Sequence, residues 1–578
     1  MTGKNKQVYS HADKILVGIL ALALFFIYML QVSELKMISI IGDEFGYWAS
    51  GSFLAGFDWS DVASYNAYYS YGYGIWLYLI LKIAKTSALA YKLAMILNTT
   101  FMVGTFILLV FIGRRIVYKC NSKIIICGAF ALMLFSGIYF SAHTSQCEAV
   151  LLFFFTIEIE LLFLYLDKAS FFKIVLLWGN TIYLYTIHQR MLVIIIALLI
   201  VMFIDAFLSD RKKIKYFFTG VIVLIALFLL TNVIKNVYLE ELYQNGRAVV
   251  SNNYSGQVGK IQTLLSLDGI RTFLMGVLGK FFYLGVTTFG LFYYGCFYLG
   301  DIVFSGIRSY KKGQQIDEYI LIALFFLLTV LGAVGISTIQ LLDNTRIDTL
   351  IYGRYTEYLI PVICEIGLVG IVCKKRKIQN IIYIIQLGLA IVLCYQLKVG
   401  NYSQLYPNNI AAIGNLYYLT WNKYSFMTYV AIGAVLFGTL LVPVICSGKK
   451  NIRYGGIFLL ALIWLFYGYS ATGAQLVPFY EKNEFSMISD ILRQVSDDGK
   501  LYYYTDHVDD TFAYLNADYI QFLAYHKQVE VLDDLEEADI SDKDILIVLS
   551  PVETKKLKKY MLIDQNSKYK VYCKYKSE

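Results

Sequence analysis

The chain has 578 residues, of which 58% are apolar, 16% are charged and only five are proline, and its formal net charge is +8. Soluble proteins are usually about 45 to 50% apolar, so this composition excludes a soluble protein and indicates a membrane protein. The nine cysteines are scattered and form no C-x-x-C pair. This argues against a zinc knuckle or a disulfide framework, and no nucleic-acid partner is expected.

Apolar residues come in runs of about 18 to 25, the length that a helix needs to cross about 30 Å of hydrocarbon. The first run, 15–32, is too long for a cleavable signal peptide and lacks a small-residue cleavage site, so we expect it to stay as a signal anchor. The runs predict about thirteen transmembrane helices, at 14–32, 89–112, 124–141, 149–166, 174–187, 191–208, 216–235, 273–300, 319–340, 355–373, 378–397, 426–446 and 454–472.

Basic residues gather in alternate connections, as in "RRIVYKCNSK", "DRKKIK" and "CKKRK". By the positive-inside rule these connections are cytoplasmic, which predicts a cytoplasmic N-terminus and a C-terminus outside. Residues 71–84 ("YGYGIWLYLILKIA") would break this alternation if they crossed the membrane, so we expect a short helix at the outer interface. Residues 33–88 then form one outer loop, and residues 237–272 form another that is long enough to cover a site.

The charge changes sign after the last run. Residues 473–578 carry 20 acidic against 13 basic side chains, and this change marks the boundary between a membrane domain, 1–472, and an outer domain, 473–578. Within the outer domain, "KLYYYTD", "VEVLDD", "DILIVLS" and "YKVYCKY" predict strands, and "DTFAYLNADYIQFLAYHK" and "PVETKKLKKYM" predict helices. The predicted fold class is a polytopic α-helical membrane protein with a small C-terminal extracytoplasmic α/β domain.

Ionisable side chains at the predicted outer face are the candidates for chemistry, because a charge at membrane depth is costly and is kept for a purpose. A hydroxyl acceptor that attacks an anomeric carbon needs a carboxylate as general base. A departing phosphate needs cations to stabilise its charge. This combination is what transfer from a lipid-linked phosphate donor requires, and the candidates are Asp43, Glu44, Glu148, His188, Arg190, Lys280, Arg354 and Glu357.

Two stretches carry a resemblance. "IGDEFGYWASGSFLAG", followed by the tyrosine-rich segment and "KLAMILNTTFMVGTFILLVFIGRR", resembles the first outer loop and second span of the GT-C superfamily of membrane glycosyltransferases. The nearest group is that of the bacterial protein O-mannosyltransferase-like and aminoarabinose-transferase-like enzymes. The resemblance implies polyprenyl-phosphate sugars as donors, an acidic pair in the first outer loop, thirteen spans and an extracytoplasmic α/β domain. Glu148 stands where the family has its second acidic residue, and "GRY" at 353–355 is similar to the family's Arg-Tyr that opens a late span.

We therefore expect a glycosyltransferase, hexosyl or pentosyl, that inverts the anomeric centre and serves an extracytoplasmic acceptor: a cell-wall polymer, a lipid or a protein. It is expected in the bacterial plasma membrane, in contact with membrane lipid. Asp43 is the predicted base, assisted by Glu44 and Glu148. The residues predicted to bind the donor phosphate are Arg354, Tyr355, Arg190, His188 and Lys280. Because the first outer loop has Asp-Glu-Phe where metal-dependent oligosaccharyltransferases have D-x-D, a requirement for Mg²⁺ or Mn²⁺ is left open.

Structural roles compete with each assignment. Asp43 and Glu148 are also suited to capping helices, and adjacent residues such as Asp43 and Glu44 cannot point the same way. Arg354 has Glu357 one turn away as an alternative partner. His188, Arg190 and Lys280 are long or polar enough to lie at the headgroup level, and the tyrosines of 64–78 are typical of an aromatic interface belt.

Three acids depart from the outer-face pattern and suggest a different class. Glu158 and Glu160 lie in the inner half of their span, and Glu365 lies within another. They are the candidates in a rival interpretation, a transporter or flippase for lipid-linked saccharide or exported polymer. Transporters commonly show internal repeats and broken helices, and the sequence shows neither. A third interpretation is a non-catalytic scaffold whose acidic outer domain binds cell-wall partners.

Overall fold

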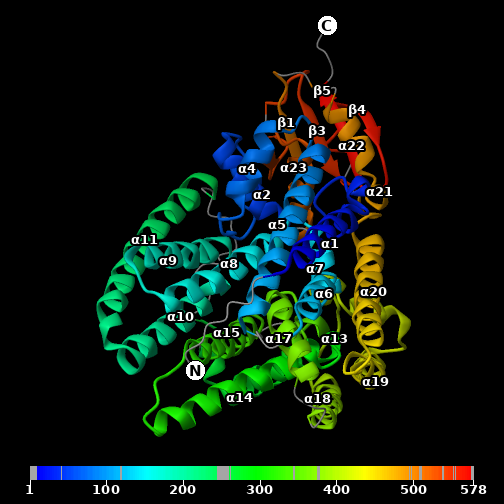
Figure 1. Cartoon of the computed structure of the whole chain (residues 1–578). Helices are drawn as coiled ribbons and strands as arrows, with labels where there is room; N and C mark the ends of the chain where they lie inside the picture. Colours follow the sequence, from blue (N-terminus) through cyan, green and yellow to red (C-terminus); the bar gives the residue numbers. More distant parts are fainter. Residues whose placement is uncertain are drawn as a thin grey trace.

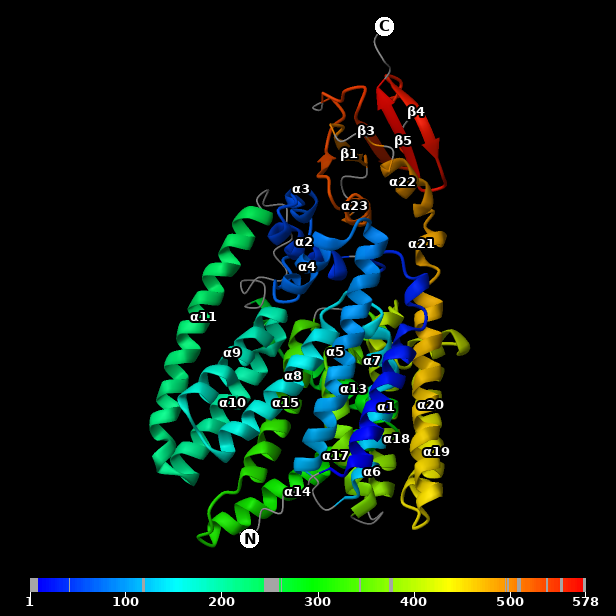
Figure 2. The same cartoon turned by 45° about the horizontal axis from the view of Figure 1, so that its top comes forward.

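The computed structural model describes residues 9–574, except 41, 117–119, 244–258, 261, 343–344, 374–377, 494, 496–497, 507–510, 537–538, 551 and 553–554. A bundle of long helices carries a small sheet domain at one end (Figure 1). The start of α1 and the sheet lie at opposite ends of the molecule (Figure 2). The long helices are α1 (His11–Met29), α5 (Ser87–Ile116), α8 (Glu148–Asp167), α9 (Phe171–Ile187), α10 (Leu192–Ile204), α11 (Ile214–Leu242), α13 (Leu267–Thr287), α14 (Leu291–Lys311), α15 (Glu318–Gln340), α17 (Ile360–Cys373), α18 (Gln379–Val399), α19 (Lys423–Ile445) and α20 (Lys450–Gln475).

The length and composition of these helices make the chain a multi-pass membrane protein. Ten helices among the described residues are long and apolar enough to cross a membrane, or eleven if the bent pair α6 (Ser122–Met133) and α7 (Ser136–Ala142) is one span. α1, α11, α19 and α20 keep large apolar side chains exposed, such as Leu22, Ile222, Leu440 and Phe466, as lipid-facing surfaces do. The count of thirteen spans and their orientation stay predictions.

One predicted span is wrong as a single helix. Residues 273–300 read as one continuous apolar run, but α13 ends at Thr287 and α14 begins at Leu291. Phe289 (φ 52°) and Gly290 (φ 85°) both adopt the left-handed conformation, which glycine reaches without steric cost. Hydropathy does not register this break, because a single glycine inside an apolar run leaves the mean hydropathy high.

The first outer loop folds into short helices, α2 (Asp43–Ala55), α3 (Ser60–Ala63) and α4 (Gly74–Ile83). The short helix expected within 71–84 is confirmed as α4. It crosses α2 closely because glycines meet there: a Cβ on Gly74 would lie 2.8 Å from the Ser50 Cβ and 3.0 Å from the Gly51 nitrogen. This loop lies between the bundle and the sheet domain (Figure 2).

The second outer loop, expected at 237–272, lies partly outside the described residues. Its described parts are the end of α11, which extends to Leu242, residues 243 and 259–260, and the stretch from 262 into α13.

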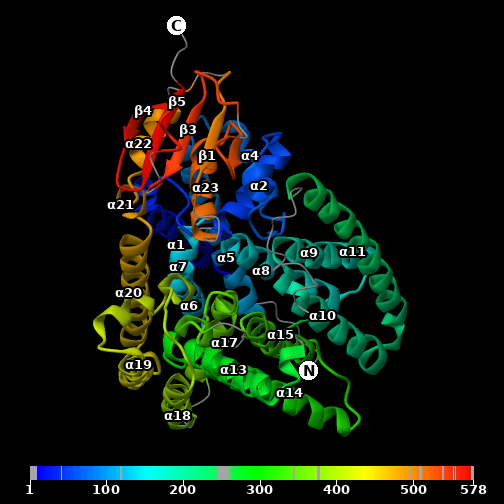
Figure 3. The ribbon, with the colours of Figure 1, turned by 180° about the vertical axis from the view of Figure 1, so that it is seen from behind.

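The C-terminal unit is a five-stranded sheet with helices. Its elements are α21 (Phe479–Lys482), α22 (Phe485–Leu492), β1 (Leu501–Tyr504), α23 (Thr511–Leu523), β2 (Val529–Leu532), β3 (Ile545–Leu549), β4 (Tyr560–Gln565) and β5 (Tyr569–Lys574). The strand order is β2-β1-β3-β5-β4. β1 pairs in parallel with β2 and β3, and β5 pairs antiparallel with β3 and β4. Figure 3 shows α23 on the side of the sheet that faces the bundle.

The four predicted strands and the helix within 510–527 are confirmed, but the helix predicted at 551–561 is wrong. Residues 555–559 form turns, and β4 begins at Tyr560. β4 is an edge strand with only Tyr560 buried, so it lacks the apolar alternation by which a half-buried strand is recognised. The domain division at 472/473 stays a prediction; α20 continues to Gln475.

Candidate active site

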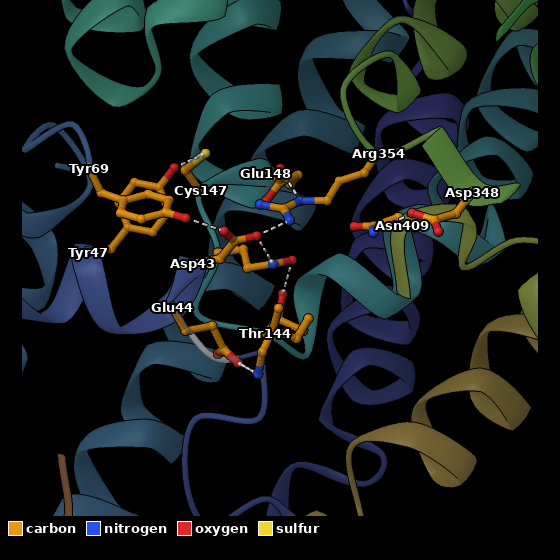
Figure 4. Close-up of polar contacts among 12 residues, drawn as sticks. Asp43, Glu44, Tyr47, Tyr69, Thr144, Cys147, Glu148, Asp348, Arg354 and Asn409 are labelled. Carbon is orange, nitrogen blue, oxygen red and sulfur yellow. Dashed lines mark hydrogen bonds and ion pairs between the residues drawn. The ribbon is translucent and has the colours of Figure 1, made fainter. Parts of the chain in front are cut away.

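Asp43, Glu148 and Arg354, from distant parts of the chain, meet at the start of the first outer loop (Figure 4), and Arg190 joins them through its bond to Glu148. Asp43 opens α2 directly after Gly42, which has a positive φ of 76°. Glu148 opens α8. Arg190 lies in the turn between α9 and α10, and Arg354 lies in the connection before α17. The predicted grouping of these side chains at one end of the bundle is therefore what the structure shows.

Two guanidinium groups share one buried carboxylate. Glu148 Oε1 accepts hydrogen bonds from Arg354 Nε at 2.9 Å and from Arg190 Nη2 at 3.1 Å. Arg354 also forms an ion pair with Asp43 through Nη1. Burial disfavours the Arg354 cation, but the carboxylates of Glu148 and Asp43 raise its pKa well above the usual value. The cluster is therefore a fixed, charge-balanced set of two acids and two cations.

Asp43 is the acid that solvent reaches. Its side chain is 27% exposed, against 8% for Glu148. Tyr69 donates a hydrogen bond to Asp43 Oδ1. Burial, and then the Asp43 charge, raise the pKa of Tyr69 well above its usual value, so its hydroxyl stays a donor. Gln146 lies beside the same pair, and its amide oxygen, when turned toward Arg354, accepts from Nη1 at 2.9 Å.

The Arg190 side chain has hydrogen-bonding capacity to spare. It is buried, and its Nε and Nη1 have no hydrogen-bond partner among the described residues. The guanidinium lies 4.6 Å from the centre of the Tyr355 ring, and His188 packs against that ring at 5.6 Å. His188 Nδ1 accepts from the Arg190 backbone N–H at 3.1 Å. Buried N–H groups without an acceptor are rare in folded proteins, so this side chain is suited to an anionic ligand.

A cavity of about 220 Å³ opens onto this cluster. Its lining includes Asp43, Arg190, Arg354, His188 and Tyr355, and it is completed by the aromatic side chains Tyr47, Tyr68, Tyr69 and Tyr185. Tyr68 and Tyr69 belong to the tyrosine-rich segment that is typical of an aromatic interface belt, and these two side chains instead line the site. The cavity offers one carboxylate, two guanidiniums and apolar ring faces.

Glu44 points away from the cavity and binds its own loop. It is fully buried and accepts from the backbone N–H of Ser39 (2.8 Å), Ile40 (2.9 Å) and Ser145 (2.7 Å), and from the Tyr91 hydroxyl (2.8 Å). These bonds fix the chain before α2 and join it to the start of α8. Asp43 thus faces the cavity and Glu44 faces its own loop, because adjacent residues on a helix point in different directions.

Lys280 and Glu357 lie apart from the cavity lining. Lys280 Nζ is 3.4 Å from the Thr349 carbonyl oxygen. Glu357 accepts a hydrogen bond from Tyr283, so the local Arg354–Glu357 pair considered above is replaced by the contacts of Arg354 with Asp43 and Glu148.

The backbone of Arg354 is held by residues that the sequence did not single out. The Asn409 carbonyl oxygen accepts from the N–H of Gly353 (3.2 Å) and of Arg354 (3.1 Å). The Asn409 side chain in turn donates to Asp348 Oδ2 at 2.9 Å, and Asp348 is fully buried. Figure 4 shows this pair behind Arg354. No local pattern signals it, because the two residues are 61 positions apart.

No group of three or more His, Cys, Asp or Glu side chains that could hold a metal ion occurs in the part of the chain that the structure describes. Between Asp43 and Glu148 lies the Arg354 guanidinium. The requirement for Mg²⁺ or Mn²⁺ stays an open expectation.

The inner acids make separate local contacts. Glu158 accepts from Asn180 and Thr181, both at 2.6 Å. Glu160 forms an ion pair with Arg115 at 3.3 Å. Both carboxylate oxygens of Glu365 lack a hydrogen-bond partner among the described residues.

Comparison with known proteins gives the fold. No protein-family model matches the chain, and no curated relative matches it. Among solved structures, ArnT from Cupriavidus metallidurans bound to undecaprenyl phosphate is similar over 98% of this chain and 99% of that chain, with 12% identity and a TM-score of 0.51. An archaeal oligosaccharyltransferase, AglB from Archaeoglobus fulgidus, is similar over 93% of this chain and 69% of that chain, with 11% identity and a TM-score of 0.47.

The likeness to ArnT extends over nearly the whole of both chains, bundle and sheet domain together. The chain shares the fold of that protein, and the expected fold class, a polytopic α-helical bundle with a small C-terminal α/β domain, is confirmed.

Proposed function

We propose that this protein is an inverting glycosyltransferase that moves a sugar from a polyprenyl-phosphate carrier to an extracytoplasmic acceptor. The observation that carries the proposal is the cavity, where one partly exposed carboxylate, Asp43, lies beside two guanidiniums, and one of these, Arg190, has unpartnered N–H groups. The GT-C fold supports it, since the ArnT of similar fold was solved with undecaprenyl phosphate bound.

Asp43 is the proposed general base. It accepts the proton of the acceptor hydroxyl while the hydroxyl oxygen attacks the anomeric carbon. The bond between that carbon and the phosphate oxygen breaks on the opposite face, and the phosphate leaves on its lipid, which inverts the anomeric centre. Glu148 is less suited to this step because it lies outside the cavity lining and because its Oε1 already accepts from Arg354 and Arg190, while its buried Oε2 has no partner among the described residues. Glu44 is less suited because its oxygens are saturated with donors and lie outside the cavity lining.

Arg190 and Arg354 are the proposed binding groups for the donor phosphate. Arg190 offers its Nε and Nη1 without giving up another contact. Arg354 forms an ion pair with Asp43 in the structure. A donor phosphate that binds Arg354 competes with Asp43 for the guanidinium, and the Asp43 carboxylate is then free to accept a proton. Tyr355 and His188 hold the Arg190 side chain and its backbone. Lys280 stands outside the cavity lining, and we assign it no donor contact.

We place the protein in the bacterial plasma membrane, with the N-terminus in the cytoplasm and the sheet domain outside. Basic residues in alternate connections support this orientation. The lipid tail of the donor then stays in the outer leaflet, while its phosphate reaches the cations at that face.

The test is a transfer assay on the purified protein in lipid, with radiolabelled polyprenyl-phosphate hexoses and pentoses and with a chelator in one set. Asp43→Asn keeps the side-chain shape and removes the base. Glu34→Gln, an exposed acid of the same loop, is the matched control. We expect the wild type and the control to release or transfer sugar and Asp43→Asn to be slower by about 10² to 10⁴-fold, the usual contribution of a general base.

Wild-type rates in a folded Asp43→Asn variant would overturn the assignment of the base. Movement of the donor across the bilayer without cleavage would favour the flippase instead. Activity lost with the chelator and restored by Mg²⁺ or Mn²⁺ would establish the metal requirement.

A further inference from the structure

Helix α23 of the sheet domain packs directly against α2 and α3 of the first outer loop, and Figure 3 shows α23 near α2. Asp518, on this helix, is fully buried, and its Oδ1 accepts a hydrogen bond from Asn66 Nδ2 at 2.7 Å. Burial raises the pKa of Asp518 well above its usual value, and the hydrogen bond from Asn66 opposes the rise. The second carboxylate oxygen, Oδ2, has no hydrogen-bond partner among the described residues, so the directional contact of Asp518 with the first outer loop is the bond from Asn66.

The contact at Asn66 leads to Asp43. Asn66 lies three residues before Tyr69, whose hydroxyl donates to the Asp43 carboxylate. The Asp518 side chain itself is absent from the cavity lining, so it acts on the site through the segment that carries Asn66 and Tyr69.

One turn further along α23, Phe522 reaches the groups that hold Glu44. Its ring packs edge-on against Trp48 at 5.2 Å and Tyr91 at 6.1 Å. Trp48 donates to Ser145 Oγ at 2.8 Å, and the Tyr91 hydroxyl donates to Glu44 at 2.8 Å. The same face of α23 therefore supports both adjacent acids.

The contact is anchored on either side of this face. The Tyr525 hydroxyl donates to the Ala84 carbonyl oxygen at 2.7 Å, and the Tyr525 carbonyl oxygen accepts from Trp59 Nε1 at 3.1 Å. The Val531 N–H donates to Asp61 Oδ2 at 2.5 Å. These hydrogen bonds and the fully buried Trp59 side chain fix the position of the sheet domain relative to the first outer loop.

We propose that α23 is a positioning element of the active site, in which Asp518, through Asn66 and the segment that leads to Tyr69, sets the place of the Asp43 carboxylate. The inference rests on the proposed role of Asp43 as general base. A base must lie within hydrogen-bond reach of the proton that it accepts, and a misplacement of about 1 Å costs about 10²-fold in rate. The sheet domain thereby has a role in the rate of transfer that does not require it to touch donor or acceptor.

The test uses the full chain and the transfer assay with a donor that the wild type turns over. The variants are Asp518→Ala, Asn66→Ala and the double variant, with Asp518→Asn as the conservative change and Asp542→Ala, an exposed acid of the same domain, as the control. Hydrogen exchange of the amides at 42–55 is measured for each variant.

We expect kcat to fall by about tenfold to a hundredfold in Asp518→Ala and in Asn66→Ala, with KM for the donor unchanged. The double variant should lose no more than the single variants, because both remove one contact. Asp518→Asn keeps an acceptor for Asn66 and should retain most of the rate, and Asp542→Ala should behave as the wild type. Exchange at 42–55 should be faster in Asp518→Ala than in the control.

An unchanged kcat in both single variants, or losses that multiply in the double variant, would overturn the proposal. If Asp518→Ala does not fold, Asn66→Ala and Asp518→Asn give the same comparison. If the wild type turns over no donor, the proposed function fails, and the exchange measurement still decides the coupling: equal exchange at 42–55 in Asp518→Ala and the control would overturn it.

Discussion

Replacement of Glu148 by glutamine tests whether this carboxylate holds the Arg190 and Arg354 guanidiniums in place, which we call its anchor role, or acts as the general base. The change removes one negative charge with little change in shape. In the wild type, Glu148 Oε1 accepts two charge-assisted hydrogen bonds, from Arg354 at 2.9 Å and from Arg190 at 3.1 Å. The three side chains are between 2 and 8% exposed. Without this carboxylate, Arg354 still pairs with Asp43, whereas Arg190 has no other ion pair among the described residues.

Removal of one partner from a buried ion pair costs about 3 to 5 kcal/mol, because a charge is left buried without compensation. The glutamine oxygen still accepts one hydrogen bond, so we expect the lower end, about 3 kcal/mol of unfolding free energy. Glu481→Gln is the matched control. Glu481 pairs with Lys36 at 2.5 Å, but both side chains are well exposed, at 64% and 41%, and such surface pairs contribute little.

The assay is unfolding of the purified variants by SDS titration in mixed micelles, followed through fluorescence of the six tryptophans. Glu148→Gln should unfold at clearly lower SDS than the wild type, and Glu481→Gln should unfold with the wild type. If Glu148→Gln is as stable as the wild type yet loses donor cleavage as Asp43→Asn does, the anchor role is refuted and Glu148 becomes the better candidate for the base.

Two further predictions concern Arg190 and His188. Arg190→Lys removes the Nε and Nη1 donors and should raise KM for the donor by about tenfold or more, since a charge-assisted hydrogen bond contributes about 1.5 to 3 kcal/mol; an unchanged KM in a kinetic titration would show that Arg190 does not bind the phosphate. Burial, with Arg190 and Arg354, holds the pKa of His188 well below its usual value, so the folded protein keeps it neutral while the unfolded chain takes up a proton below pH about 6.5. Stability should therefore be lost as pH falls below about 6.5, and His188→Asn, which keeps an acceptor for the turn, should lose less; equal pH profiles of unfolding would contradict this.

The sequence alone predicted that Asp43, Glu148, Arg190 and Arg354 lie at the same end of the molecule. Asp43 and Arg354 are 311 positions apart, yet the alternation of basic connections placed them at the same membrane face, and the structure joins them. This works because membrane spans impose a regular up-and-down path, so the side of each connection follows from counting.

Sequence reasoning could not tell which acid faces the cavity. Asp43 and Glu44 are neighbours with the same chemistry, and their roles separate only because α2 begins at Asp43 and turns Glu44 toward Ser145 and Tyr91. Helix rotation depends on what packs around the helix, which local patterns do not encode. The break at Phe289–Gly290 and the strand β4 were missed for a related reason, since hydropathy and periodicity average over single residues.

Composition, apolar runs and charge thus determined by themselves a membrane protein with a C-terminal α/β unit, because the cost of placing polar groups in hydrocarbon acts on every residue. The side-chain contacts between distant segments could not be predicted from the sequence and are seen only in the tertiary structure. Arg190 and Arg354 share Glu148, Asp348 holds Asn409 behind Arg354, and Asp518 reaches Asn66. Hydrogen bonds of this kind depend on distance and direction between side chains far apart in the chain, which only the packed fold fixes.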